Sequence, residues 1–199
     1  YPGGDPADVT DLMKINIITA VPATDPDNTV LPANLRLPAI PRLTPTPGLR
    51  PRDVVAKENM VPGIEELEVP GEVLLNGYHF MDPTTDLIKA GTTETWQWIN
   101  LTVDSHPMHP HLVTFQVVNR QQFDVDAYTA DWQAYLDSGR TLPKPNVSNF
   151  LIGGAVPPDP EERGYKDTVK APPGYVTRTR AKFTLPRTSL LDYNWMTRS

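Results

Sequence analysis

Hydrophobic residues in this chain occur in short runs, and most of these runs alternate with polar residues. Beyond about residue 60 the pattern predicts short β-strands over 64–69, 72–75, 94–102, 111–119 and 175–185. Glycine, proline and asparagine separate the runs. Strands of this length with such boundaries indicate an all-β sandwich or barrel.

Three other segments complete the pattern. Residues 125–136 contain neither proline nor glycine, so we expect a short helix within a long connection. Residues 13–21 are rich in β-branched side chains and predict a strand that has no partner nearby. The stretch 22–51 holds eight prolines, which predicts an extended linker and a domain boundary.

Composition narrows the possible partners of the chain. Proline accounts for 23 of the 199 residues, about 12% against an average of about 5%, which disfavours long helices. Asp and Glu number 24 against 18 Lys and Arg, so the formal net charge is −6. We therefore expect neither nucleic acid nor an anionic membrane as a partner, because both require a basic surface. No stretch approaches the ~18 apolar residues of a membrane span.

Three of the four histidines fall within the segment HPMHPH at residues 106–111. A metal site requires imidazole nitrogens to converge within about 2 Å of one ion. Side chains on an extended segment repeat every two residues, so His109 and His111 are expected on one side, serving one metal centre. His106 stands at an odd offset from both and is expected to serve a different metal.

The strand predicted from residue 111 would place His111 on the same face as Val113, Phe115 and Val117, and so tie the histidines to the core. Other interpretations remain open at this point. One alternative is a metal-free loop in which the histidines are hydrogen-bonded. A mononuclear cupin-like site would require a Glu shortly after His111, where the sequence has LVTF. A helical zinc motif is absent, and the prolines exclude the helix it needs.

The remaining candidate residues indicate structural roles. His79 has no partner histidine at metal spacing and is expected to be an ordinary surface or turn histidine. Trp96 and Trp98 alternate on one strand and are expected in the core. The segment 161–163 (EER) is expected to be a solvated charged loop.

Several segments together resemble a known family, the multicopper oxidases, and within it the group of bacterial spore-coat laccases, bilirubin oxidases and phenoxazinone synthases. The segments that carry the resemblance are LLNG (74–77), TETW (93–96), NLT (100–102), HPMHPHLVTFQV (106–117) and GYKDTV (164–169). They resemble the final cupredoxin domain of these enzymes.

The resemblance implies an all-β Greek-key cupredoxin sandwich or barrel with a Pro-rich N-terminal linker. Residues 60–199 would form the C-terminal cupredoxin domain, incomplete at its C-terminus. Residues 22–59 would form the linker, and residues 1–21 would be a remnant of the preceding cupredoxin domain.

The resemblance also implies copper as the cofactor. In the family's pattern, His106 would ligate the type 1 copper, which takes electrons from the substrate. His109 would ligate the type 2 copper, and His111 a type 3 copper of the trinuclear cluster. The implied activity is oxidation of phenolic or other electron-rich substrates, coupled to reduction of dioxygen to water. The remaining ligands would come from other domains of the oxidase or from a partner chain.

The sequence departs from the family pattern near its C-terminus. Met196, Thr197 and Arg198 stand where the family has an H-C-H segment, and the chain has no cysteine. Neither Thr nor Arg can replace the thiolate of a blue copper site. Pro110 also replaces the usual aliphatic residue between the last two histidines. We therefore expect the chain alone to supply only some copper ligands and to be inactive by itself.

Two explanations account for this departure: a fragment of a longer oxidase, or a degenerate stand-alone domain. The fragment is favoured, because the sequence begins with an isolated strand and then crosses a linker. The alternative function is that of a non-catalytic cupredoxin-like binding or interaction domain without a functional copper centre.

Overall fold

The computed structural model describes residues 16, 30–36, 38–63 and 70–184. The chain divides into two units, Tyr1–Ile40 and Pro41–Ser199. The described part of the first unit includes one short 3-10 helix, η2 (Pro32–Asn34), none of whose residues is buried. The strands and the candidate site belong to the second unit.

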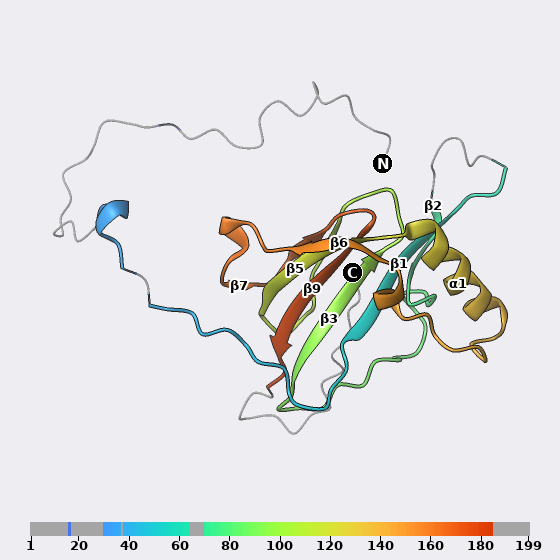
Figure 1. The fold of residues 1–199 in the computed structure, drawn as a ribbon, viewed down its shortest axis with the longest axis horizontal. Helices are drawn as coiled ribbons and strands as arrows, with labels where there is room; N and C mark the ends of the chain where they lie inside the picture. The colour runs from blue at the N-terminus through green and yellow to red at the C-terminus, as the bar shows by residue number, and fades with distance from the viewer. Residues whose placement is uncertain (1–15, 17–29, 37, 64–69, 185–199) are drawn as a thin grey trace. The chain divides into compact units, whose positions relative to one another are not determined.

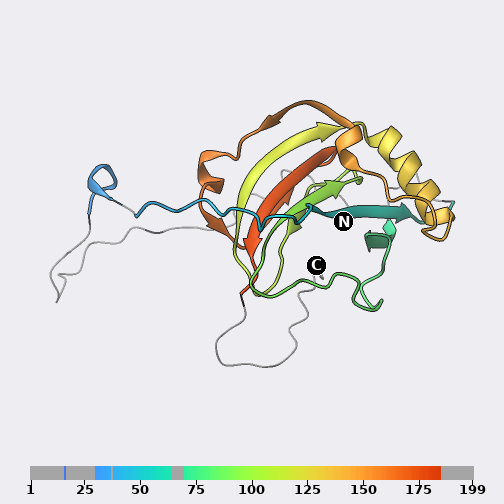
Figure 2. The ribbon, with the colours of Figure 1, turned by 60° about the horizontal axis from the view of Figure 1, so that its bottom comes forward.

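In the described part of the second unit, seven strands form the main sheet. Their order is β2-β1-β3-β9-β5-β6, and β7 pairs with β5 (Figure 1). β1 and β3 run parallel, and the other neighbours are antiparallel. The strands curve together, as Figure 2 shows. Their bounds are β1 (Arg52–Met60), β2 (Pro70–Leu75), β3 (Thr93–Asn100), β5 (Phe115–Phe123), β6 (Leu151–Val156), β7 (Tyr165–Lys166) and β9 (Tyr175–Lys182).

A small second sheet and one α-helix accompany the main sheet. Asp124 caps the helix, because its Oδ1 accepts a hydrogen bond from the backbone N–H of Ala127 at 3.0 Å. Among the described residues, no helix is long and apolar enough to cross a membrane. The bounds are β4 (His106–Met108) and β8 (Val169–Ala171) for the small sheet, α1 (Val125–Asp137) for the helix, and η4 (Val147–Asn149) and η5 (Pro160–Glu162) for two 3-10 helices.

Alternation along the strands divides the buried residues between two cores. The first core joins one face of the main sheet to the small sheet and includes Val54, Ala56, Trp96, Trp98, Met108, Phe115, Val117, Val169, Ala171, Ala181 and Phe183. The second core joins the other face to α1 and includes Val55, Ile99, Phe123, Tyr128, Trp132, Val147 and Val176. Each face of the main sheet therefore carries a core, and the small sheet, which begins at His106, is held against the first one.

The structure confirms the all-β prediction and the helix expected over 125–136. The strands predicted over 72–75, 94–102 and 175–185 correspond to β2, β3 and β9. Trp96 and Trp98 lie in the first core, as expected. The strand predicted over 64–69 lies outside the described residues. The one predicted over 13–21 also lies outside them, apart from Asn16.

Two features differ from the sequence-based expectation. The strand predicted from residue 111 begins only at Phe115, because residues 111 and 112 form a turn. β1 follows the proline-rich stretch 22–51 and lies in the range 22–59 that the resemblance implied to be a linker, so the sheet starts before residue 60. β1 owes its place to pairing with β3, far along the chain, and local composition does not reveal such pairing.

Phe115 provides a test of the first core. Its side chain is fully buried, and we expect Phe115→Ala to lower the free energy of unfolding by about 3–5 kcal/mol, because the change removes buried surface and leaves a cavity. Leu87, 79% exposed, is the control, and Leu87→Ala should stay within about 0.5 kcal/mol. Chemical denaturation measures both, and equal effects would contradict the assigned core.

Candidate metal centre

His106 begins β4 and is half-buried. Its Nε2 lies 2.6 Å from Oγ1 of Thr102, and that hydroxyl also bonds Oδ1 of Asn100 at 2.9 Å. The Thr102 hydroxyl can accept a hydrogen bond from the Nε2–H of His106 while it donates one to Oδ1 of Asn100. Since one ring nitrogen is engaged in this way, Nδ1 is the nitrogen left for a metal.

Asn100 anchors the loop that carries His106. Its side chain is fully buried, and Nδ2 donates to the carbonyl oxygens of Asp104 at 2.7 Å and Ala171 at 2.9 Å. Its Oδ1 accepts from the backbone N–H of Thr102 at 2.8 Å. One side chain thus ties the end of β3 to the following loop and to β8, opposite His106 in the small sheet.

A carboxylate lies on the same side of the His106 ring as Thr102. Oε1 of Glu58 is 3.8 Å from His106 Nε2, and the Glu58 side chain is only 8% exposed. Its other oxygen, Oε2, is buried and has no hydrogen-bond partner. His106 therefore has a largely desolvated carboxyl group beside its engaged nitrogen.

His109 is engaged through the opposite ring nitrogen. Its Nδ1 lies 2.8 Å from the backbone carbonyl oxygen of Asp167 and 3.3 Å from Oγ1 of Thr168. A carbonyl only accepts, so Nδ1 carries the proton and Nε2 is left for a metal. The exposed rings of His109 and His111 meet edge to face, with centroids 5.2 Å apart.

A turn, and not a strand, brings His109 and His111 together. Leu112 has φ 66°, a left-handed conformation that reverses the chain before β5 begins at Phe115. The expected proximity of the two rings is present, but the expectation that His111 extends a core strand is wrong. The physical reason is that the period-two rule holds only inside an extended segment.

The segment that orients His109 is itself held by an ion pair. Arg120 of β5 forms a salt bridge with Glu162 and donates to the carbonyl oxygen of Lys170 at 2.9 Å. These contacts fix residues 162 and 170 on either side of Asp167. The Arg120 guanidinium holds the pKa of Glu162 below its ordinary value. The expectation of a solvated charged loop is therefore wrong for Glu162.

The donor atoms suit copper, although no complete site forms within the chain's described ranges. There, no group of three or more His, Cys, Asp and Glu residues converges. Neutral imidazole nitrogens are ligands that copper accepts, and His106 and His109 each have one such nitrogen directed away from its protein partner. Met196, Thr197 and Arg198 lie outside the described residues. His79 is 56% exposed and bonds Glu72, in agreement with a surface role.

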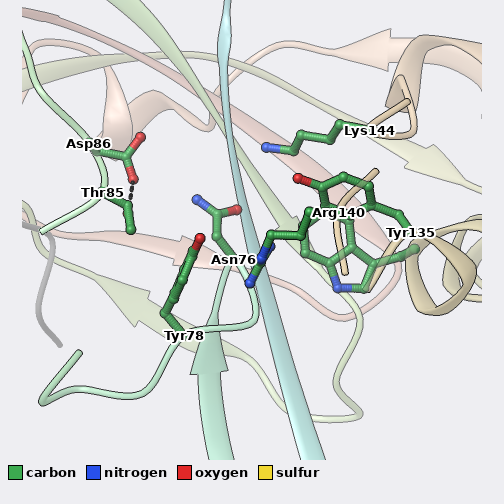
Figure 3. A pocket seen from close by; sticks show the side chains of 8 residues that line it. Asn76, Tyr78, Thr85, Asp86, Tyr135, Arg140 and Lys144 are labelled. Atoms are coloured by element: carbon green, nitrogen blue, oxygen red, sulfur yellow. Dashed lines mark hydrogen bonds between the residues drawn. The ribbon is translucent and has the colours of Figure 1, made fainter. Parts of the chain in front are cut away.

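A small pocket of about 120 Å³ lies elsewhere in the second unit (Figure 3). Arg140 stacks over the ring of Tyr78 at 4.1 Å, and burial lowers the pKa of Lys144. The candidate histidines do not line it, so it is separate from the metal centre. Its lining residues are Asn76, Tyr78, Thr85, Asp86, Trp132, Tyr135, Arg140 and Lys144.

Comparison with known proteins decides the family. The family described as multicopper oxidase matches residues 53–198, which is most of the chain. This chain belongs to the multicopper oxidase family. The match includes the histidine segment and all strands of the described residues, except the first residue of β1.

Several relatives are similar to this multicopper oxidase chain. "Multicopper oxidase LPR1 homolog 3" of Oryza sativa subsp. japonica is 30% identical over 195 residues, covering 93% of this chain and 36% of that protein. A laccase of Bacillus subtilis (strain 168) is 41% identical over 111 residues, covering 56% of this chain and 19% of that protein. A laccase structure from Pediococcus acidilactici has TM-score 0.49 and 24% identity, covering 79% of this chain and 26% of that one. The chain thus spans about a third or less of these relatives.

Sequence reasoning did not identify Thr102, Glu58 or the carbonyl of Asp167 as neighbours of the histidines. Thr102 and Asp167 fall inside the segments NLT and GYKDTV that carry the family resemblance, and this was the one sequence signal that could have indicated them. Glu58 has no such signal, because only the pairing of β1 with β3 brings it near His106.

Asn100 provides a test of the loop that carries His106. We expect Asn100→Ala to lower the free energy of unfolding by about 3 kcal/mol, because buried backbone groups of Thr102 and Ala171 lose their partner. The exposed Asn149 is the control, and Asn149→Ala should have little effect. Denaturation curves of the two variants give the comparison, and a small loss for Asn100→Ala would remove its anchoring role.

The Arg120–Glu162 pair predicts a pH dependence. Folding lowers the pKa of Glu162 below its ordinary value of 4.5. The ion pair therefore stabilises the folded chain fully above the unfolded-state pKa, and this stabilisation is lost as the pH falls through the lowered folded-state pKa. We expect Glu162→Gln to be less stable than the unmodified chain near pH 7, with the difference shrinking in acid. Measuring the free energy of unfolding of both chains as a function of pH tests this. Glu161→Gln, which changes the exposed neighbouring residue, is the control. A difference that is constant with pH would contradict the assignment.

Proposed function

We propose that this chain is part of a copper-dependent oxidase that oxidises phenolic or other electron-rich substrates and reduces dioxygen to water. Within that enzyme it would supply some of the copper ligands. The observation that carries this proposal is the opposite use of ring nitrogens at His106 and His109. Hydrogen bonds engage Nε2 of His106 and Nδ1 of His109, so each ring keeps a different nitrogen for a metal.

The ligand roles follow the family pattern. His106 would bind the type 1 copper through Nδ1, His109 the type 2 copper through Nε2, and His111 a type 3 copper. Bound copper supplies the one-electron redox chemistry that side chains lack. The contact between the rings of His109 and His111 supports their placement at neighbouring metals, and His106 makes its contacts with other residues.

The chain's own residues would hold the ligands in place. Thr102 and Asn100 hold the ring of His106, and the Asp167 carbonyl selects the tautomer of His109. Several relatives are named laccase or multicopper oxidase and are much longer than this chain. Other domains or a partner chain would therefore provide the remaining ligands, including a cysteine.

Replacement of each histidine in the native polypeptide tests the proposal. We expect His106→Ala to abolish the blue absorption of the type 1 copper while most other copper is retained. His109→Ala and His111→Ala should keep the blue absorption and lose dioxygen uptake, because they affect the trinuclear cluster. Copper analysis, absorption spectra and oxygen consumption measure these outcomes, with His79→Ala as control.

Other results would favour the alternatives. A native polypeptide of 22.1 kDa that binds no copper would support a non-catalytic cupredoxin-like interaction domain. Loss of one and the same metal in all three variants would indicate a mononuclear cupin-like site. A mass well above 22.1 kDa together with several coppers per molecule would agree with the proposed oxidase.

A further inference from the structure

We propose that Glu58 is a positioning residue for His106, and that its buried carboxylate lowers the reduction potential of the copper that His106 binds. The inference rests on the proposed function, since it requires copper at His106. It assigns a role to a residue that lies far from the histidine segment in the sequence.

The position of Glu58 follows from the alternation of β1. Val54 and Ala56 belong to the first core, and Glu58 continues the same period-two face. This face meets the small sheet, whose first residue is His106. A charged side chain thus occupies the end of an otherwise apolar row and lies beside the proposed ligand.

The burial of Glu58 requires an electrostatic explanation. Its side chain is 8% exposed, and Oε2 has no hydrogen-bond partner. Its carboxylate lies beside the ring of His106, with 3.8 Å between Oε1 and Nε2. A desolvated carboxylate is strongly unfavourable unless a positive charge lies nearby. A metal bound to the other nitrogen of the same ring would supply that charge.

The geometry around the ring separates the roles of Thr102 and Glu58. The Thr102 hydroxyl, 2.6 Å from Nε2, accepts a hydrogen bond from the Nε2–H, which leaves Nδ1 to the metal. Glu58 is too distant for a hydrogen bond and acts through its charge. Its attraction fixes the orientation of a ring that shares the positive charge of the metal.

The negative charge of Glu58 would stabilise the two oxidation states of the copper to different extents. A type 1 copper bound by His106 would accept one electron from the reducing substrate and change from Cu(II) to Cu(I), while the substrate is oxidised. A nearby carboxylate stabilises the more positive Cu(II) form more than Cu(I), because Coulomb attraction grows with charge and is strong where water is excluded. The carboxylate therefore makes electron uptake less favourable, and the potential falls.

The test measures the reduction potential of the type 1 copper in the full-length, copper-loaded oxidase. Glu58→Gln keeps the size of the side chain and removes its charge. We expect the ratio of reduced to oxidised copper at a fixed applied potential to rise about tenfold, which is ~59 mV for a one-electron couple. The blue absorption and the copper content should persist.

Two further variants make the result specific. Glu72→Gln makes the same chemical change on β2, where the side chain is 46% exposed, and should leave the potential unchanged. Glu58→Asp keeps the charge but shortens the side chain, so its potential should lie between those of the unmodified oxidase and Glu58→Gln. If Glu58→Gln fails to bind copper, a raised potential in Glu58→Asp still supports the proposal.

The outcomes separate this inference from the proposed function. If Glu58→Gln keeps its blue absorption and its reduction potential is unchanged, the proposed role of Glu58 is overturned. If Glu58→Gln does not bind copper, an unchanged reduction potential in Glu58→Asp overturns that role. A merely structural role would lower stability without moving the potential. Absence of type 1 copper from the unmodified oxidase would instead overturn the proposed function.

Discussion

The structure around the histidines depends on the hydrogen bonds of one buried amide, Asn100. Its side chain joins the end of β3 to the following loop and to β8, through Thr102, Asp104 and Ala171. The amide is fully buried and both of its ends are satisfied, so the loop has little freedom to rearrange. The position of His106 follows from this, because its ring bonds Thr102 and its backbone pairs with Ala171.

The same principle applies at His109, where a rigid element again orients an exposed ring. Arg120 lies on β5, an inner strand of the main sheet between β9 and β6, and holds Glu162 and the carbonyl of Lys170. The segment between them carries the Asp167 carbonyl that bonds His109. Both histidines thus lie at the edge of the hydrophobic core and take their orientation from partners fixed by strands.

Much of the fold was predictable from local pattern. β3, β9 and α1 have strong periodicity and clear boundaries, and they appear where the pattern placed them. β1 was not predicted, because its strand character comes from pairing with Trp96 to Asn100 of β3. The start of β5 was misplaced, because the turn at Leu112 uses a left-handed leucine, which carries no glycine or asparagine signal.

The sequence alone was sufficient for the histidine motif, the β-rich class and the resemblance to the family, since these depend on residue type and spacing. Folding was required to select the ring nitrogen that stays available at His106 and His109, and to bring Glu58 beside His106. The reason is physical: spacing sets side-chain direction only within one regular element. The partners that orient these rings come from other elements, and long-range strand pairing alone determines where those elements meet.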